Sequence, residues 1–235
     1  MADAGRRAQL AASLGEVRER IAHACADAGR PAGAVTLVAV TKTYPASDVV
    51  LLAELGVTEV GENRDQEAAP KAAAAAAEGA KVRWHYIGQL QRNKARSVAG
   101  YADVVESVDS VRLVAALDHA AAGRPAPLEV LVQVSIDGDP ARGGVAGDDL
   151  WRVSDAAAAA DGLRLGGLMA VAPLGWAPDR AFEQLAALSV RLAAAHPGAT
   201  TLSAGMSGDL EAAVRHGATH VRIGTSLLGM RNLLR

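Results

Sequence analysis

Val35-Thr-Leu-Val-Ala-Val-Thr41 sets the pattern of the whole chain. Its residues are β-branched or apolar at both odd and even positions, as in a strand that is covered on both sides of a parallel sheet. A stretch with helical spacing follows at 46–55, and a second β-rich run extends from Val57 to Asn63. We therefore expect a strand–helix–strand unit with parallel strands.

The same alternation recurs along the chain. The β-rich runs are Val35–Thr41, Val57–Asn63, Val82–Gly88, Asp103–Val108, Leu128–Ser135, Leu163–Val171, Thr200–Met206 and His220–Thr225. Helical stretches follow these runs near 46–55, 64–77, 91–99, 110–122, 148–160, 178–195, 208–216 and 226–231. Eight units in 235 residues predict an α/β fold, a single (β/α)8 TIM barrel over residues 1–235, with an extra N-terminal helix at 6–28. A doubly wound open sheet is the alternative, because strand count alone does not exclude it.

Composition narrows the class of protein. The formal charge is 24 − 26 = −2 and aromatic residues make up 3% of the chain, which argues against a nucleic-acid or anionic-membrane partner. Cys25 is the only cysteine, so an intrachain disulfide is impossible and a reducing compartment is the simple interpretation. The N-terminus lacks the apolar segment of a signal peptide, and we expect a soluble, cytoplasmic and monomeric protein.

Polar residues gather at the predicted carboxyl ends of the strands, where a barrel carries its active site. Such residues occur at Thr41–Thr43, Gly61–Asn63, His85–Gly88, Ser203–Ser207 and Arg222–Ser226. The opposite ends of the strands show little comparable polarity, so the sequence predicts one functional end.

Lys42 is the sharpest candidate among these residues. It shares strand parity with Val38 and Val40, and we expect all three to face the barrel interior. A partly desolvated amine at an apolar rim can attack an aldehyde and form a Schiff base. A lysine that extends from the strand end to water is an equally good interpretation of the spacing.

The loops after the last two strands have the composition of a phosphate site. Gly224-Thr-Ser226 opens a short helix and offers backbone amides and hydroxyls. Ser207 can cap a helix that starts at Gly208, although the acids in its first turn would repel an anion. Arg222 can contact a phosphate or a ring nitrogen, or form a salt bridge to an acid such as Glu62. Ordinary helix caps remain the alternative explanation of both loops.

Several motifs in order resemble one known family. They are Val38-Ala-Val-Thr-Lys42, Gly61-Glu-Asn63, His85-Tyr-Ile-Gly-Gln-Leu-Gln-Arg-Asn-Lys94, Gly167-Leu-Met-Ala170, Leu202-Ser-Ala-Gly-Met-Ser-Gly-Asp209 and Val221-Arg-Ile-Gly-Thr225. Together they resemble the pyridoxal-phosphate homeostasis proteins, the YggS/PROSC family, over nearly the whole chain.

The resemblance implies a barrel like the N-terminal domain of alanine racemase, with pyridoxal 5′-phosphate (PLP) as a Schiff base on Lys42. It also implies that Arg222 faces the pyridine nitrogen and that Asn63 lies near the lysine and the ring. The residues implied around the phosphate are Ser203, Ser207, Gly224 and Thr225. Met206 is implied as a further cofactor-binding residue. No metal is implied.

The function expected from these features is PLP homeostasis without strong catalytic activity. An arginine at the ring nitrogen weakens the ring as an electron sink. A racemase of this fold also takes a second base from a further domain, for which we expect no room in this chain. The protein would hold PLP and pass it to apo-enzymes. The alternatives are a PLP-dependent amino-acid racemase or lyase of low activity and, less favoured, a Schiff-base aldolase for sugar phosphates.

Overall fold

Eight parallel strands close into a barrel in the computed structural model, which describes residues 2–139 and 142–229. Each strand pairs with the next one along the chain, and β8 closes the circle on β1. The strands are β1 (Thr36–Val40), β2 (Glu59–Glu62), β3 (Arg83–Tyr86), β4 (Val104–Val108), β5 (Leu128–Gln133), β6 (Leu163–Met169), β7 (Thr201–Ser203) and β8 (His220–Ile223). The predicted (β/α)8 barrel is confirmed, and the open sheet is excluded.

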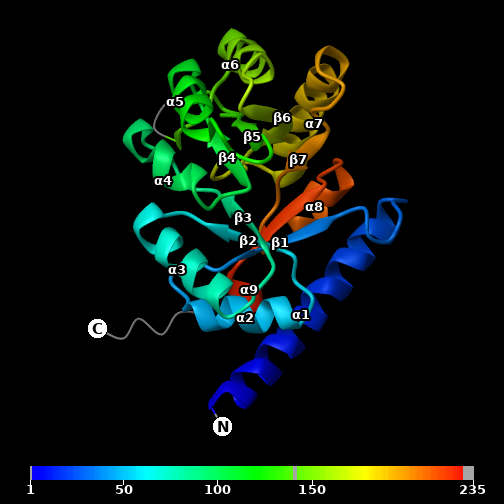
Figure 1. Cartoon of the computed structure of the whole chain (residues 1–235). Coiled ribbons are helices and arrows are strands. Elements are labelled where there is room, and N and C mark those ends of the chain that lie inside the picture. Colours follow the sequence, from blue (N-terminus) through cyan, green and yellow to red (C-terminus); the bar gives the residue numbers. More distant parts are fainter. Residues whose placement is uncertain (1, 140–141, 230–235) are drawn as a thin grey trace.

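Helices surround the barrel, and one long helix precedes it (Figure 1). They are α1 (Ala2–Asp27), α2 (Ala46–Glu54), α3 (Asp65–Ala77), α4 (Ala95–Ala99), α5 (Val111–Ala121), α6 (Asp148–Ala158), α7 (Pro178–Ala195), α8 (Leu210–Arg215) and α9 (Thr225–Leu228). The helix expected at 91–99 is a 3₁₀ turn, η1 (Arg92–Lys94), followed by α4. The end of the helix expected at 226–231 lies outside the described residues. Within the described ranges, no helix is both long and apolar enough to cross a bilayer.

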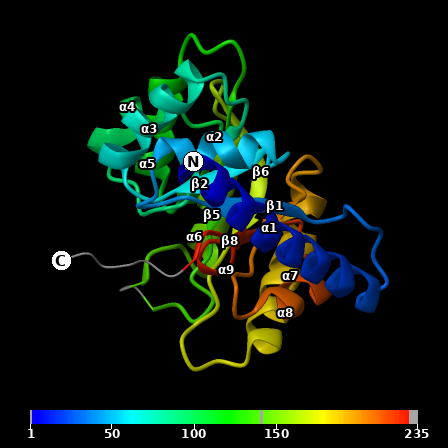
Figure 2. The ribbon, with the colours of Figure 1, turned by 90° about the horizontal axis from the view of Figure 1, so that it is seen from below.

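The extra N-terminal helix runs along the outside of the barrel. It lies against α8, α9 and α2, so it covers the seam where β8 meets β1 (Figure 1 and Figure 2). Leu10, Leu14 and Val17 are buried there, at the three- and four-residue spacing that the sequence shows. This contact explains why α1 is ordered without a preceding strand.

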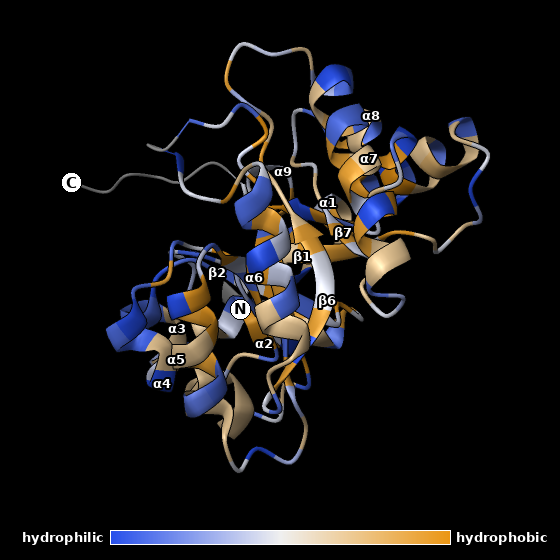
Figure 3. Ribbon diagram, turned by 90° about the horizontal axis from the view of Figure 1, so that it is seen from above, coloured by the Kyte–Doolittle hydropathy of each residue, from blue (hydrophilic) through white to orange (hydrophobic). Residues whose placement is uncertain are grey.

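The strands carry two different faces. Ala39 and Val60 point outward and belong to the apolar cluster beneath the helices. Val38 and Val40 point inward, since a methyl group built on Gly61 would meet the side chains of both. In Figure 3 the ribbon of β1 is orange, that is hydrophobic, while the surrounding helices carry both blue and orange segments. Burial on both sides is the physical reason for the continuous apolar run of β1.

The strand register determines which loops are neighbours. Val40 pairs with Gly61 of β2, and Val38 pairs with Arg222 of β8. The loops that follow β1, β2 and β8 therefore emerge side by side at the same end of the barrel.

Candidate functional site

Lys42 follows β1 on a backbone that is held from both sides. The preceding Thr41 donates its amide to the carbonyl of Gly61 at 3.0 Å, and its carbonyl accepts from Nζ of Lys71 at 2.8 Å. The Thr41 hydroxyl donates to Oε1 of Glu62 at 2.7 Å. The side chain of Lys42 is half-buried and makes no hydrogen bond or ion pair within residues 2–139 and 142–229. Its amine is thus free of a protein counter-ion there.

The residue after Lys42 has an unusual backbone. Thr43 has φ of 69°, the only positive φ of a non-glycine residue among those described. This region is sterically costly for a β-branched residue, and such conformations persist where surrounding contacts enforce them. Here the amide of Tyr44 donates back to the carbonyl of Thr41 at 3.0 Å, which closes a tight turn around Lys42.

Asn63 is held beside this turn by close backbone packing. A Cβ atom on Gly88 would lie 2.1 Å from the carbonyl oxygen of Asn63, so only glycine fits there. The hydroxyl of Tyr86 donates to the same carbonyl at 3.5 Å. The side chain of Asn63 is half-buried and forms no hydrogen bond within the described ranges, which leaves its amide available to a ligand.

The loops after β7 and β8 come together, as the sequence predicts. The hydroxyls of Ser207 and Ser226 are 2.9 Å apart, and Gly224 lies against Val40 at the end of β1. We call residues 205–208 and 224–226 the cup. Thr225 and Ser226 open α9, so their amides have no partner within the helix. The cup therefore presents amides and three hydroxyls next to the loop that carries Lys42.

Two details of the cup differ from expectation. Asp209, not Ser207, occupies the N-cap position of α8, and it makes no side-chain cap bond. The predicted cap at Ser207 is wrong because the helix starts at Leu210. Asp209 instead accepts the amide of Met206 at 2.6 Å, so that amide is already satisfied.

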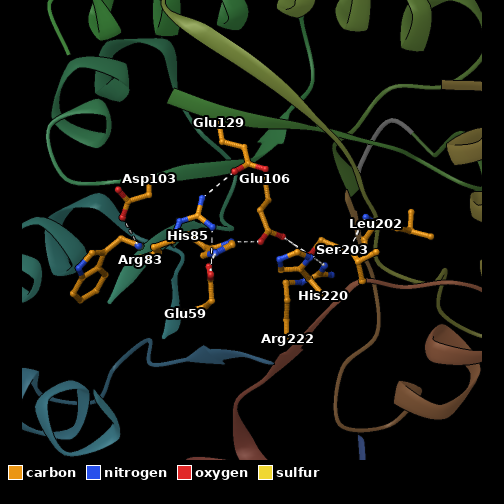
Figure 4. Close-up of polar contacts among 12 residues, drawn as sticks. Glu59, Arg83, His85, Asp103, Glu106, Glu129, Leu202, Ser203, His220 and Arg222 are labelled. Carbon is orange, nitrogen blue, oxygen red and sulfur yellow. Dashed lines mark hydrogen bonds and ion pairs between the residues drawn. The ribbon is translucent and has the colours of Figure 1, made fainter. Parts of the chain in front are cut away.

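A chain of charged side chains crosses the barrel interior below the cup (Figure 4). His85 donates from Nδ1 to Oε1 of Glu106 at 2.6 Å, and from Nε2 to Glu59. Ser203 donates to Oε2 of Glu106 at 2.6 Å and accepts from Nη1 of Arg222 at 2.7 Å. We call Glu59, His85, Glu106, Ser203 and Arg222 the buried charge chain. It links the middle of the barrel to the floor of the candidate site.

His85 is a cation in this arrangement. Both ring nitrogens face carboxylate oxygens, so both must carry a proton. Burial lowers the pKa of His85, but the hydrogen bonds to Glu106 and Glu59 outweigh burial and raise the pKa to about 9. Burial likewise favours neutral Glu106, yet His85 and Arg222 lower the pKa of Glu106 to about 2. The chain therefore alternates negative and positive charge.

Arg222 is the last residue of the buried charge chain, and several of its N–H donors have no partner within the described residues. Its side chain is nearly inaccessible, and burial lowers the pKa of its guanidinium. Nη2 donates to the carbonyl of Ala170 at 2.9 Å, and Nη1 lies 3.7 Å from Glu106. Within the described residues, two of the five N–H donors are used, one by Ser203 and one by Ala170. The acid near Arg222 is Glu106; Glu62, suggested by the sequence, pairs with Lys71 at 2.6 Å.

The buried charge chain corrects one sequence-based expectation. The amino-terminal half of the barrel is not short of polarity, because Glu59 and Glu129 lie inside it and bind Arg83. Ser203 is fully buried, and its hydroxyl proton is committed to Glu106. The sequence signal was present: Glu59 shares strand parity with Gly61, the same argument that we applied to Lys42.

Comparisons with known proteins support one family. The profile of the family described as alanine racemase, N-terminal domain, matches residues 13–232. A pyridoxal phosphate homeostasis protein of Mycobacterium leprae is 47% identical, with 97% of this chain and 95% of that protein aligned. The one from Escherichia coli is 37% identical, over 95% of this chain and 97% of that protein.

A solved structure agrees with these relatives. PipY of Synechococcus elongatus, solved with PLP bound, superposes with a TM-score of 0.81 and is 32% identical. The superposition covers 94% of this chain and all of PipY. The chain therefore belongs to the pyridoxal phosphate homeostasis proteins, a family built on the barrel of the alanine racemase N-terminal domain.

Proposed function

We propose that this chain binds pyridoxal 5′-phosphate as a Schiff base on Lys42 and serves PLP homeostasis. One observation carries the proposal: the Lys42 amine, which has no counter-ion within residues 2–139 and 142–229, stands on a fixed turn beside the cup. The homeostasis relatives and the PLP-bound PipY support it. Residues 1–235 would act as a single PLP-binding domain.

The residues present fit the group. Ser207, Gly224 and Thr225 would hold the phosphate through hydroxyls and amides, since no basic side chain is needed where unpaired amides converge. Met206 would line the same cup, with its amide held by Asp209. Asn63 would contact the cofactor near Lys42. When bound, PLP supplies an aldehyde that the lysine amine captures reversibly.

Arg222 would meet the pyridine nitrogen from the floor of the site, and Ser203 would hold Arg222 there. The guanidinium donates hydrogen bonds and cannot accept a proton, so it favours an unprotonated ring nitrogen. A ring of that kind is a weaker electron sink than one protonated by a carboxylate partner. This favours storage of PLP over catalysis.

Storage also requires that the cofactor leave again. We propose that the protein passes PLP to apo-enzymes and keeps the free aldehyde scarce. A cytoplasmic location and a monomeric state remain predictions of the same proposal. An amino-acid racemase or lyase of low activity is the second candidate, because the Schiff base and the barrel would serve it equally. Solvent deuterium exchange at the α-carbon of common amino acids would favour that candidate; its absence would favour storage.

The chain offers a direct test, because it contains only four lysines: Lys42, Lys71, Lys81 and Lys94. The protein would be incubated with PLP, reduced with borohydride and mapped by peptide mass spectrometry. We expect the reduced pyridoxyl group on Lys42, its loss in Lys42→Ala, and its retention in Lys81→Ala, which alters an exposed lysine. Modification elsewhere, or none, would overturn the proposal.

A further inference from the structure

Through arginine side chains, the helix α1 contacts the β7 loop of the cup and the end of α9, the short helix that the β8 loop of the cup opens. Arg20 donates from Nη1 to the carbonyl of Ser207 at 2.7 Å. Arg6 donates from Nη2 to the carbonyl of Leu228 at 3.2 Å, at the end of α9. One helix thus reaches the β7 loop and the β8 loop from outside the barrel, where it lies against α8 and α9 (Figure 1).

Arg20 also neutralises an acid close to the cup. Its Nη2 and Nε donate to the two carboxylate oxygens of Glu211 at 2.7 and 2.5 Å, which is a bidentate pair. Glu211 stands in the first turn of α8, four residues after Ser207, where a free carboxylate would repel an anion. The hydrogen bonds to Glu211 and its charge raise the pKa of the Arg20 guanidinium, against a smaller effect of burial.

The second loop has a matching attachment. Arg6 is itself fixed by Asp48 of α2, to which Nε and Nη2 donate at 3.1 and 2.6 Å. Tyr44, two residues after Lys42, donates its hydroxyl to the carbonyl of Gly229 at 2.7 Å. The carbonyls at the C-terminal end of α9 are therefore tied to α1 and to the lysine loop. The Arg6 guanidinium lies 5.7 Å from the centroid of the Tyr44 ring.

We propose that α1 braces the phosphate end of the site, with Arg20 and Arg6 as positioning residues that hold the two loops of the cup together. The helix is additional to the eight units of the barrel. Its arginines contact the carbonyls of Ser207 in the cup and of Leu228 at the end of α9, which leaves the hydroxyls and free amides of the cup for the anion. Loss of Arg20 would free the Ser207 loop and expose the charge of Glu211 to the phosphate. This inference rests on the proposed binding of PLP.

The same helix provides a matched control. Arg18 donates to the carbonyls of Leu55 and Gly56 at 3.3 and 2.9 Å, in the loop that precedes β2. It is an arginine of α1 with two bonds to backbone carbonyls, but it acts at the opposite end of the barrel. Arg18→Met removes hydrogen bonds to backbone carbonyls, as Arg20→Met does, but it breaks no ion pair and does not touch the cup.

The test compares PLP with pyridoxal, which lacks the phosphate, in the full chain. We expect Arg20→Met to raise the dissociation constant for PLP about tenfold, with a faster off-rate. Its dissociation constant for pyridoxal should change less than about twofold, because the phosphate end alone is affected. Arg6→Met should show a smaller loss of the same kind, and Arg18→Met none for either ligand.

Three results would overturn the inference. Equal effects of Arg20→Met on PLP and pyridoxal would mean general loosening of the protein, as would equal effects of Arg18→Met and Arg20→Met on PLP. Unchanged PLP binding in Arg20→Met would reject the brace directly. Each of these outcomes leaves the proposed function intact if borohydride still fixes PLP on Lys42. A wild-type protein without that adduct refutes the function itself.

Discussion

The buried charge chain and the cup treat polar groups in opposite ways. In the chain, Glu106 is fully buried and both its oxygens accept from His85 or Ser203. In the cup, hydroxyls and amides stand at the surface with donors to spare. Satisfied buried polar networks rigidify a core, while unsatisfied groups at a rim are ready for a ligand. We therefore expect Glu59, His85 and Glu106 to matter chiefly for stability, and the cup and Lys42 to matter chiefly for the proposed ligand binding.

Removal of His85 should have the largest effect on stability. His85→Leu leaves Glu59 and Glu106 without the cation that lies between them, and uncompensated buried charge typically costs about 3–5 kcal/mol. We expect the free energy of unfolding, measured by urea denaturation, to fall by that amount. His119→Leu, at an exposed histidine of α5, should change it by less than about 0.5 kcal/mol. Equal losses of stability in His85→Leu and His119→Leu would contradict the stabilising role of the buried charge chain.

The pH dependence of stability should be nearly as large. The pKa of His85 rises from 6.5 to about 9 on folding, so its contribution is complete below pH 6.5 and is lost as the pH rises through 9. That contribution is on the order of 3 kcal/mol. Glu106, with its pKa lowered to about 2, contributes fully above pH 4.5 and loses its contribution toward pH 2. Urea midpoints measured from pH 5 to 9.5 check the contribution of His85.

The variant His85→Leu sharpens the pH experiment. Its stability should no longer decline between pH 6.5 and 9 in the way that the wild-type stability does. A wild-type curve that is flat over this range would show that His85 is not the cation which the geometry requires.

The barrel was predictable from the sequence because its strands carry a simple signal. β1 is apolar on both faces, and each strand is followed by a helix, which few architectures satisfy. The N-terminal helix was also predictable, from the spacing of Leu10, Leu14 and Val17. The attachment of this helix to the cup was not predictable, because Arg20 lies 187 residues from Ser207. The pattern of residues in the helix does not indicate so distant a contact.

The candidate site was predictable only in part. Strand parity predicted the inward faces of Val38 and Val40, and the last two loops do meet. The predicted acid partner of Arg222, Glu62, was wrong. The acid near Arg222 is Glu106, which lies on β4, across the barrel from β8. Parity assigns a side chain to the interior; it does not say which of several interior acids it reaches.

Ser203 lies in the buried charge chain between Glu106 and Arg222, and its loss should have an intermediate effect on stability. Ser203→Ala removes one donor to Glu106 and one acceptor for Arg222, both buried, which should cost about 1–2 kcal/mol of the free energy of unfolding. Ser47→Ala, at an exposed position of α2, is the control. An unchanged free energy in Ser203→Ala would mean that Arg222 keeps its place without the hydroxyl.

Lys42→Ala should have the smallest effect on stability, although it should abolish the PLP adduct. The side chain has no partner within the described ranges, and the turn around it is held by Thr41 and Tyr44 through their backbones. We expect the free energy of unfolding without PLP to change by less than about 0.5 kcal/mol. A substantial gain in stability would indicate that the amine is strained or repelled in the free protein. A substantial loss would indicate that Lys42 supports the fold, which would contradict the separation of stability in the buried charge chain from ligand binding at the cup and Lys42.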